Sequence, residues 1–520
     1  MDDERKYGSG SLEKRRFTRI VKTVPVEFKS CQAVSGGATA RDVSEGGLCI
    51  EAEQIEQESL RELLSKKAEV SIKIDLPSEF GAVEVAAQIA WIKDKEASEG
   101  KLCFGVRFTG IPEEYQGKIK LYIERQSKIT KLDFVPRKKD KNFDPEFVAH
   151  RRQWLSEKTN TRFFHTGYFS TPSEDMKGNI ENLIGVTQIP IGVAGPLKIN
   201  GQYAKGTFYI PLATTEGTLV ETYQRGMLVI TKAGGANVIV TKDVINVSPV
   251  FILEDISKIK GFILWVEENF EKIKEKAEKT TRYGKLLKIT PLFLGKRVIL
   301  NFCYTTGDAM GLNMINIATD RACEYIRENV KTEGFYLRSN FSSDKKASVY
   351  NLITGYGKEV LVEVTLSKKI VNRYLNSTPE EIYNFWYVGF LGSYQAGMIG
   401  LNAHFANGLA AIFIACGQDV AQIINANVGI VMCEITKNGD LCISAKFPNL
   451  VIGTVGGGTS LKTQRECLES IGCYGSDKAK KFAEIVAASI LAGEISICAA
   501  LASGVFIKAH ETKRNIAHTE

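Results

Sequence analysis

The chain has 520 residues, of which 44% are hydrophobic and 24% are charged, with a formal net charge of +7. This length exceeds the roughly 250 to 300 residues at which one hydrophobic core stops growing, so a single small domain is excluded. The modest net charge argues against a nucleic-acid partner. The 11 cysteines include no C-x-x-C pair, which indicates reduced thiols in a cytoplasmic protein rather than a disulfide framework or a zinc site.

The first 128 residues are predicted to be mostly β-structure. Short runs rich in β-branched residues alternate with Gly, Pro or charged turns. A compact barrel or sandwich closes such a set of strands, and one helix over 113–126 is expected to follow. The predicted strands cover residues 24–28, 48–50, 70–74, 83–92 and 102–108.

Residues 129–145 are predicted to be a linker, because they show no hydrophobic period. From 146 to 520 the pattern changes to long helices alternating with strands, including a charged surface helix over 268–279. The apolar segment 485–507 is long enough to span a bilayer. However, Glu494 at its centre would be costly in lipid, so we expect a buried core helix and no membrane association.

Two short polar motifs lie in the N-terminal domain. Arg15 and Arg19 form R-x-x-x-R, and Asp42, Ser44 and Gly47 form D-x-S-x-x-G, which we place at the start of a strand. Paired arginines can bind two phosphates and stack on purine faces. Asp and Ser on a glycine-containing turn offer an acceptor and a donor to a guanine edge. Either motif alone fits a solvated basic run or an unrelated turn better than a binding site.

The two motifs in this order, in front of a small β-domain, resemble the PilZ family, whose β-barrels bind cyclic di-GMP. The resemblance covers about residues 11–128. It implies that Arg15 and Arg19 hold the dinucleotide from an N-terminal arm, while Asp42, Ser44 and Gly47 make the contacts on the barrel side. The alternative is a barrel that serves only for packing or protein contact.

The common catalytic templates are absent from the sequence. It contains no H-x-x-x-H metal pair, no Walker loop, no G-x-S-x-G and no Rossmann glycine motif, so we expect no metal. Instead, Glu216, Lys345, Asp419 and His510 each adjoin an apolar segment, a setting that shifts pKa values and often marks a site. Taken singly, they also fit a structural Lys345–Asp419 ion pair and a helix-terminal histidine.

Seven longer motifs follow one another in the second domain. They are ENLIG at 181–185, IPIGVAGPL at 189–197, ATTEG at 213–217, GDAMGLNM at 307–314, DKK at 344–346, GQD at 417–419 and GTVGGGT at 453–459. On these motifs, residues 146–515 resemble the catalytic domain of 3-hydroxy-3-methylglutaryl-CoA (HMG-CoA) reductases, closer to class I, the class of eukaryotes and archaea. The resemblance implies a multidomain chain with an α+β reductase body and a small cofactor-binding domain inserted at about 227–337.

The resemblance also implies a reaction, in which the thioester of HMG-CoA is reduced twice with NADPH, through a hemithioacetal and mevaldehyde, to mevalonate and CoA. Lys345 would stabilise the negative charge on the thioester oxygen. Glu216 would donate a proton to the aldehyde oxygen, a role that needs a raised pKa in a dry pocket. Asp419 would lie between Lys345 and Glu216, and His510 would protonate the departing CoA thiolate.

Cofactor and substrate contacts are implied in the same way. Arg282 matches an arginine that meets the adenosine 2′-phosphate, which favours NADPH over NADH. Arg225 would bind the distal carboxylate of the substrate. The other implied cofactor residues are Asp308, Met310, Gly311, Asn313, Gly456 and Gly457, and the other implied substrate residues are Lys346 and Asn407. The glycines equally fit a tight turn, and Asn407, like His404, equally fits a satisfied core group.

One segment departs from the family pattern. The family has a second substrate-binding Lys shortly before N-x-V-G-S-A-x-A-G, whereas residues 385–397 read FWYVGFLGSYQAG, with an aromatic residue at the lysine position. Two alternatives therefore stay open: a reductase of a related acyl-CoA, and an inactive reductase-like scaffold that acts as a cyclic di-GMP effector. The resemblance further implies a homodimer or larger homo-oligomer with the active site at the subunit interface.

Overall fold

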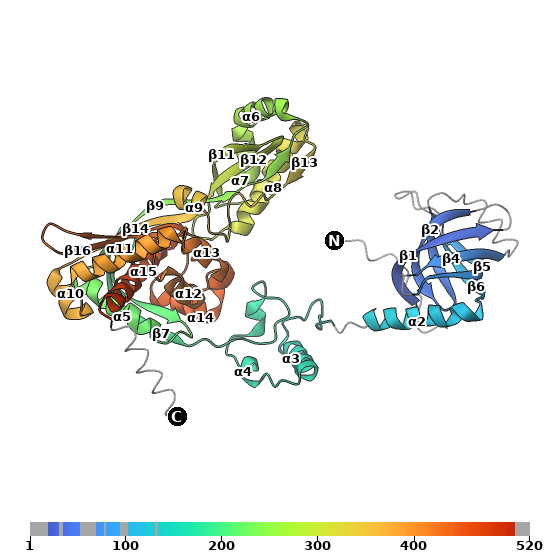
Figure 1. Ribbon diagram of the computed structural model, residues 1–520, viewed down its shortest axis with the longest axis horizontal. Coiled ribbons are helices and arrows are strands. Elements are labelled where there is room, and N and C mark those ends of the chain that lie inside the picture. Colours follow the sequence, from blue (N-terminus) through green and yellow to red (C-terminus); the bar gives the residue numbers. More distant parts are fainter. Residues whose placement is uncertain are drawn as a thin grey trace. The chain divides into compact units, whose positions relative to one another are not determined.

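The computed structural model describes residues 19–30, 35–52, 69–76, 80–93, 102–130 and 134–504. Contacts divide the chain between Val135 and Pro136 into two compact units, and each is described by itself. This division falls inside the segment 129–145 that the sequence predicts as a linker. Figure 1 labels the elements of both units.

The first unit contains a closed barrel of six antiparallel strands in the order β1-β2-β3-β6-β5-β4, which confirms the prediction of a small β-barrel. Alternation builds its core: in β4, Val70, Ile72 and Ile74 are buried while the residues between them are partly exposed. Helix α2 (Glu113–Thr130) adds Tyr122 and Ile123 to this core. The strands are β1 (Arg19–Ser30), β2 (Ser35–Ser44), β3 (Gly47–Ala52), β4 (Glu69–Asp75), β5 (Ala82–Lys93) and β6 (Leu102–Gly110).

Strand β2 was missed by the sequence prediction. Its residues, SGGATARDVS, are small or polar and carry no hydrophobic alternation. The strand forms because both of its edges are paired, one with β1 and the other with β3. Asp42 and Ser44 therefore lie at the end of β2, and the motif ends at Gly47, the first residue of the predicted strand, β3.

The second unit is built on a ten-stranded sheet with the path β13-β10-β12-β9-β14-β16-β15. Strand β11 pairs with β12, and the β7–β8 hairpin joins through β7 to β9. The first strands are β7 (Ile191–Gly201), β8 (Lys205–Ala213), β9 (Ala236–Val247), β10 (Val250–Ile252) and β11 (Lys285–Leu294). The others are β12 (Arg297–Thr305), β13 (Gly334–Tyr336), β14 (Gly357–Leu366), β15 (Ile430–Ile435) and β16 (Leu441–Leu450).

Helices cover this sheet and connect its strands. In chain order, the first of them are α3 (Pro145–Thr159), α4 (Phe164–Gly167), α5 (Leu219–Lys232), α6 (Ile259–Glu268), α7 (Phe270–Glu278), α8 (Leu312–Asn329) and α9 (Val349–Thr354). They are followed by α10 (Lys368–Leu375), α11 (Pro379–Gln395), α12 (Phe405–Ala415), α13 (Ile423–Ala426), α14 (Lys462–Ser470) and α15 (Ala479–Ala502). The predicted surface helix over 268–279 is α7, which buries Ile273 and Ala277.

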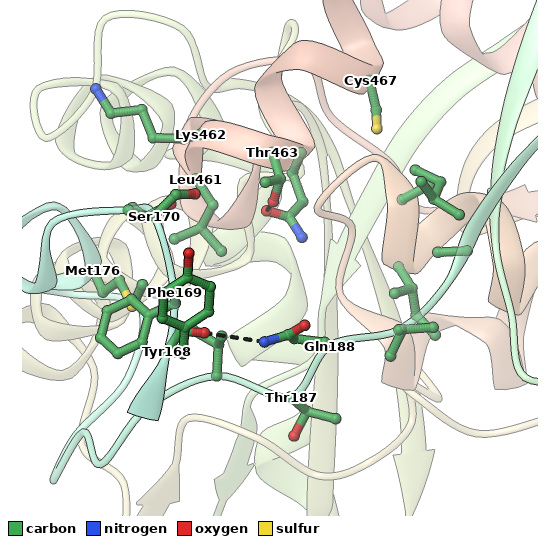
Figure 2. A pocket seen from close by; sticks show the side chains of 18 residues that line it. Tyr168, Phe169, Ser170, Met176, Thr187, Gln188, Leu461, Lys462, Thr463 and Cys467 are labelled. Atoms are coloured by element: carbon green, nitrogen blue, oxygen red, sulfur yellow. Dashed lines mark hydrogen bonds between the residues drawn. The ribbon is translucent and has the colours of Figure 1, made fainter. Parts of the chain in front are cut away.

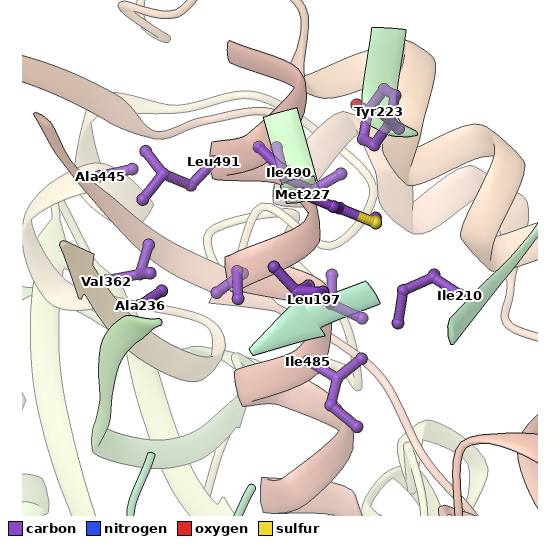
Figure 3. Close-up of a cluster of buried hydrophobic side chains, with 14 of the residues drawn as sticks. Leu197, Ile210, Tyr223, Met227, Ala236, Val362, Ala445, Ile485, Ile490 and Leu491 are labelled. Carbon is purple, nitrogen blue, oxygen red and sulfur yellow. The ribbon is translucent and has the colours of Figure 1, made fainter. Parts of the chain in front are cut away.

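Helix α15 forms the centre of the main core. The sequence predicted a buried helix over 485–507, but α15 begins six residues earlier, at Ala479, and ends at Ala502. Every residue over 482–500 is buried, although the helix is long and apolar enough to cross a membrane. Figure 3 shows its residues Ile485, Ile490 and Leu491 among side chains from β7, β8, α5, β9, β14 and β16.

A smaller body with its own core is formed by β10 to β13 and α6 to α8 (Figure 1). Strand β9 is shared by both bodies, because residues 237–244 pair with β14 and residues 245–247 pair with β12. This body overlaps the stretch over 227–337 for which the sequence predicts an inserted cofactor-binding domain.

Candidate active site

The loop that carries Lys345 lies between β13 and α9 and has an unusual backbone. Asn340, Ser343 and Lys345 have φ values of 65°, 54° and 55°, in the left-handed region that residues other than glycine rarely adopt. Asp344 anchors the loop, because its buried carboxylate accepts hydrogen bonds from Arg338 Nη2 at 2.7 Å and from Gln422 Nε2 at 2.8 Å. The loop is therefore held in one conformation by contacts on both sides.

The segment after α12 supplies further support for this loop. The Asn425 amide donates to the carbonyl oxygens of Ser343 and Lys346 at 2.9 and 3.2 Å. The Asn351 amide donates to the Ser343 carbonyl from the other side, at 3.4 Å. Gln422 and Asn425 were not predicted as site residues, and amides in a short helical segment give no sequence signal that would distinguish them.

Lys345 and Asp419 form an ion pair, with Nζ and Oδ2 2.6 Å apart. Their side chains retain 39% and 26% of their exposure, so both atoms remain accessible to a ligand. Asp419 also accepts a hydrogen bond from the backbone N–H of Ala421 through Oδ1, at 3.1 Å. This bond fixes the carboxylate at the start of a 3₁₀ turn, and the pair combines a positioned cation with a positioned acceptor.

Glu216 lies at the other end of α12. It is exposed in the loop after β8, and both of its carboxylate oxygens accept from Asn407 Nδ2, at 3.1 and 2.9 Å. Asn407 is in the first turn of α12, whereas Asp419 follows its last turn. The 11-residue helix spans roughly 16 Å, so one chain keeps Glu216 well apart from the Lys345–Asp419 pair.

Arg225 and Lys346 make contacts within the protein. Arg225 donates from Nε to Ser496 Oγ at 2.9 Å and from Nη2 to the Ser496 carbonyl at 2.7 Å. Burial lowers the pKa of Arg225. Lys346 Nζ donates to the Asp344 carbonyl at 3.2 Å. Arg225 thus joins α5 to α15 in this structure, a contact that the sequence did not reveal.

The two segments predicted to contact the cofactor lie side by side. Ala309 and Val455 form a parallel bridge, and the Thr454 N–H donates to the Asp308 carbonyl at 2.8 Å. The Asp308 carboxylate accepts from the backbone N–H groups of Asp477, Lys478 and Ala479, at 2.7, 3.0 and 2.9 Å. It therefore caps the N-terminus of α15, a structural role for a residue that the sequence assigned to the cofactor.

Arg282 is exposed, and the next residue, Tyr283, lies close to Gly307. The preceding Thr281 hydroxyl contacts Met314 Sδ at 2.8 Å, which joins the Arg282 loop to the first turn of α8. Gly311 precedes that helix, with a φ of 80°. Asn313 is exposed in the same turn, and Met310 packs against the core of the smaller body. These predicted cofactor residues are thus brought together.

Gly456 and Gly457 have positive φ values of 76° and 56°. A Cβ atom built on either one would meet no other atom within 4 Å, so their backbone faces open space. The adjacent Gly458 differs, because it lies against the backbone of Gly417. Gly456 and Gly457 are also exposed, so a ligand can approach this turn.

A pocket of about 500 Å³ adjoins the C-terminal end of α12. Figure 2 shows Tyr168 and Phe169 on one side of it, Leu461 and Thr463 on another, and Gln188, which donates to the Tyr168 carbonyl at 3.0 Å. The IPIGVAGPL and ATTEG motifs contribute Ile189 and Ala213 to its lining. None of the predicted site residues that the structure describes lines this pocket.

In the barrel, the Ser44 hydroxyl donates to the Gly47 carbonyl at 3.0 Å across the β2–β3 turn. A side chain at Gly47 would overlap the backbone of Val106, so close packing of β3 against β6 accounts for this glycine. Arg19 is the first residue of β1, and Asp42 is partly buried near the end of β2. Arg15 and His510 lie outside the described residues.

Comparison with known proteins gives two family matches. Residues 147–515 match the hydroxymethylglutaryl-coenzyme A reductase model, and residues 13–125 match the PilZ domain model. The 3-hydroxy-3-methylglutaryl-coenzyme A reductase of Methanocaldococcus jannaschii is 46% identical over 399 residues, covering 75% of this chain and 98% of that protein. The protein of the same name from Pyrococcus horikoshii is 46% identical over 370 residues, covering 69% and 90%.

A solved structure is also similar. The class II 3-hydroxy-3-methylglutaryl-CoA reductase from Streptococcus pneumoniae, bound to NADPH in open conformations, has a TM-score of 0.53 and 17% identity. The alignment covers 68% of this chain and 96% of that one. At this identity the likeness concerns the fold.

Proposed function

Since the chain belongs to the hydroxymethylglutaryl-coenzyme A reductase family, we propose that its second unit reduces HMG-CoA to mevalonate and CoA at the expense of NADPH. The observation that carries this proposal is the Lys345–Asp419 pair at 2.6 Å, held on a supported loop within the matched region. An exposed cation of fixed position suits a reaction in which a carbonyl oxygen gains negative charge.

Lys345 would donate a hydrogen bond to the thioester oxygen and later to the aldehyde oxygen. The contacts to Asp344 and to the carbonyls around it hold the loop before substrate binds, so little reorganisation is required when charge develops. Asp419 would accept from the Lys345 ammonium and keep it oriented. His510 would protonate the departing CoA thiolate.

Glu216 would donate the proton to the aldehyde oxygen. In one chain it is exposed and lies at the opposite end of α12 from Asp419. A proton donor of this kind needs a pocket from which water is excluded. We therefore infer that a homodimer or larger homo-oligomer completes the site and encloses Glu216 at the subunit interface.

The residues around the smaller body fit NADPH. Gly456 and Gly457 are exposed and follow the bridge between Ala309 and Val455, and the loop of the exposed Arg282 contacts the first turn of α8 through Thr281. The Arg282 guanidinium would bind the 2′-phosphate. NADPH, when bound, supplies the hydride. The protein contributes orientation, because the bridge between Ala309 and Val455 holds the two segments together.

The test is an assay of NADPH oxidation with HMG-CoA, with NADH as the alternative reductant. Removing one fixed donor to a developing oxyanion costs about 10²- to 10³-fold in kcat, so we expect at least this loss in Lys345→Ala. Lys346→Ala, next in the sequence, is the matched control and should change KM more than kcat. No turnover by the wild-type protein, or full turnover by Lys345→Ala, refutes the proposal.

A related acyl-CoA is a second candidate substrate, because residues 374–436 contain no Lys or Arg that could bind a distal carboxylate. The same assay with acyl-CoA thioesters that lack this carboxylate distinguishes the two. A higher kcat/KM for these thioesters than for HMG-CoA would favour the second candidate. A chain that reduces neither would be a reductase-like scaffold.

We propose further that the first unit binds cyclic di-GMP and regulates the reductase. The support is the PilZ match over residues 13–125, together with Asp42 and Ser44 at the end of β2 and Gly47 at the start of β3. Calorimetric titration of cyclic di-GMP into the wild type and into Arg15→Ala/Arg19→Ala tests binding, and equal affinity refutes the assigned arm. Regulation requires that saturating ligand changes kcat or KM, and unchanged values refute it.

A further inference from the structure

The first N–H group within helix α12, that of Phe405, donates to Asn402 Oδ1 at 3.2 Å. His404 occupies the N-cap position, and its side chain makes no capping hydrogen bond. The first N–H groups of a helix lack partners within the helix, and leaving them unpaired in the interior is costly. The N–H groups of Ala403 and His404, which come just before the first helical residue, find their partner about 90 residues further along the chain, in the middle of α15.

That partner is Glu494, whose residue is 1% exposed. Its Oε1 accepts from the His404 N–H at 2.6 Å, and its Oε2 accepts from the Ala403 N–H at 2.9 Å. A negative charge at a helix N-terminus is also favoured by the helix dipole. An ionised carboxylate is the stronger acceptor for these two N–H groups, because in the protonated carboxyl one of the two oxygens carries the proton.

The first turn of α12 contacts the candidate active site through Asn407. Asn407 follows three residues after His404 and holds both oxygens of Glu216. The ring of His404 stacks on Tyr223 with centroids 5.6 Å apart, and Tyr223 is fully buried between α12 and α15. Side chains at Gly408 or Gly493 would overlap Tyr223, so α12 and α15 both pack directly against this ring.

We propose that Glu494 is a positioning residue for the reduction, which holds the first turn of α12 so that Asn407 presents the Glu216 carboxyl to the substrate. This role rests on the proposed reductase function. Glu494 does not touch the substrate, and it acts through two backbone N–H groups and Asn407.

The charge state of Glu494 supports a link to pH. Burial raises its pKa to about 7, and the hydrogen bonds from Ala403 and His404 act in the opposite direction. Among the described residues, the titratable groups close to it are Tyr223 from α5, His404 from α12, Cys433 from β15 and Cys498 from α15. Helix α11 and strand β16 present apolar side chains to it.

These neighbours hold little charge near neutral pH. Burial raises the pKa values of Tyr223, Cys433 and Cys498, and it lowers that of His404. The nearby guanidinium of Arg225 is bound to Ser496. Protonation of Glu494 therefore weakens the hydrogen bonds that its carboxylate accepts without a compensating change in the groups that face it.

Helix α15 also supplies a matched control. Glu484 is fully buried ten residues before Glu494 and accepts from the N–H groups of Gln202, Tyr203 and Ala204. These residues form the turn between β7 and β8, whereas Glu216 follows the far end of β8. The two glutamates thus have similar burial and similar contacts, but only Glu494 supports an element of the site.

The experiment compares Glu494→Gln and Glu484→Gln in the full chain, by NADPH oxidation with HMG-CoA over pH 5.5 to 9. We expect Glu494→Gln to lower kcat by about tenfold or more with KM within about threefold, since this change misplaces a group used in the transition state. Glu484→Gln should leave both within about twofold. The wild-type kcat should show a titration near pH 7 that Glu494→Gln lacks. A wild-type kcat and pH profile in Glu494→Gln would overturn the proposal.

A double variant tests the route through Asn407. If Glu494 acts through that residue, Asn407→Ala/Glu494→Gln should have a kcat within about twofold of Asn407→Ala alone. Multiplication of the two single losses would overturn the route. Absence of wild-type turnover refutes the reductase function itself, whereas wild-type turnover with an unaffected Glu494→Gln refutes the positioning role alone.

A measurement on the wild-type protein covers the case in which Glu494→Gln fails to fold. Labelling with ¹⁵N-histidine gives one backbone amide signal for each of the 5 histidines. The His404 signal, assigned with His404→Gln, should shift with a midpoint near pH 7, because its N–H donates to Glu494. A His404 signal that does not move between pH 5.5 and 8.5 overturns the proposal.

Discussion

The buried carboxyl of Glu494 should make the stability of the protein depend on pH in a way that Glu494→Gln removes. Burial raises the pKa of Glu494 from its ordinary 4.5 to about 7. A carboxyl with a raised pKa binds its proton more tightly in the folded state than in the unfolded state. Its favourable contribution is therefore complete below pH 4.5, falls as the pH rises, and is lost above about pH 7.

The magnitude follows from this difference in pKa. About 2.5 pH units at 1.36 kcal/mol each correspond to roughly 3 kcal/mol of unfolding free energy. Glutamine cannot ionise, so the Glu494→Gln variant keeps the contribution of the neutral group at every pH. The unfolding free energy of the wild type minus that of the variant should therefore decrease by about 3 kcal/mol between pH 4.5 and 7.5.

Urea unfolding followed by tryptophan fluorescence measures this difference. Trp386 lies beside Glu494 on α11, so its emission reports on the part of the core concerned. Comparing the two proteins at each pH removes the contribution of every other titrating group. A difference that stays constant from pH 4.5 to 7.5 would refute the reasoning, because it would mean that the carboxyl has the same pKa in both states.

Three further predictions concern residues for which the structure gives a packing or capping role. Asp308→Ala should lower the free energy of unfolding, measured in urea, by about 2 to 4 kcal/mol, because three N–H groups at the start of α15 lose their carboxylate acceptor. A variant as stable as the wild type would contradict this capping role. Arg225→Ala should cost about 2 to 3 kcal/mol in the same measurement through loss of its two bonds to Ser496. A change in the KM for HMG-CoA with no loss of stability would show instead that Arg225 serves the substrate. Gly226→Ala should cost about 3 kcal/mol in thermal or urea unfolding, because the added methyl would overlap the backbone of α15. Gly261→Ala, in a helix position with no atom within 4 Å, should stabilise the protein by about 0.5 to 1 kcal/mol, and equal effects of the two substitutions would contradict the packing argument.

The barrel shows which strands can be predicted from local sequence patterns and which cannot. Five of its six strands were predicted, because an alternation of β-branched residues can be recognised in the sequence alone. Strand β2 was missed since its small residues gain their partners from β1 and β3, which are recognisable only after the barrel closes. Because β2 was missed, the sequence did not show that Asp42 and Ser44 belong to this strand, although the motif does end at the start of β3.

The candidate active site also contains features that the sequence predicts and others that it does not. The motifs placed Lys345 and Asp419 in the sequence, and the structure brings them to 2.6 Å. The roles of Asp308 and Arg225 could not be predicted in this way, because the N–H groups and the serine that they bind lie about 170 and 271 residues further along the chain. Sequence spacing carries no information on such distant backbone partners.

The sequence by itself determined two domains, a β-barrel followed by an α+β body, and the order of the motifs that identify the family. These features depend on local periodicity and on contiguous motifs, which need no tertiary contact to be recognised. Only the tertiary structure decided what Glu494 does: in the sequence it was one charge that made a membrane span costly, whereas in the fold it accepts hydrogen bonds from the N–H groups just before α12. The physical reason is that a buried carboxylate must find hydrogen-bond donors, and which donors it finds depends on the packing of α12 against α15.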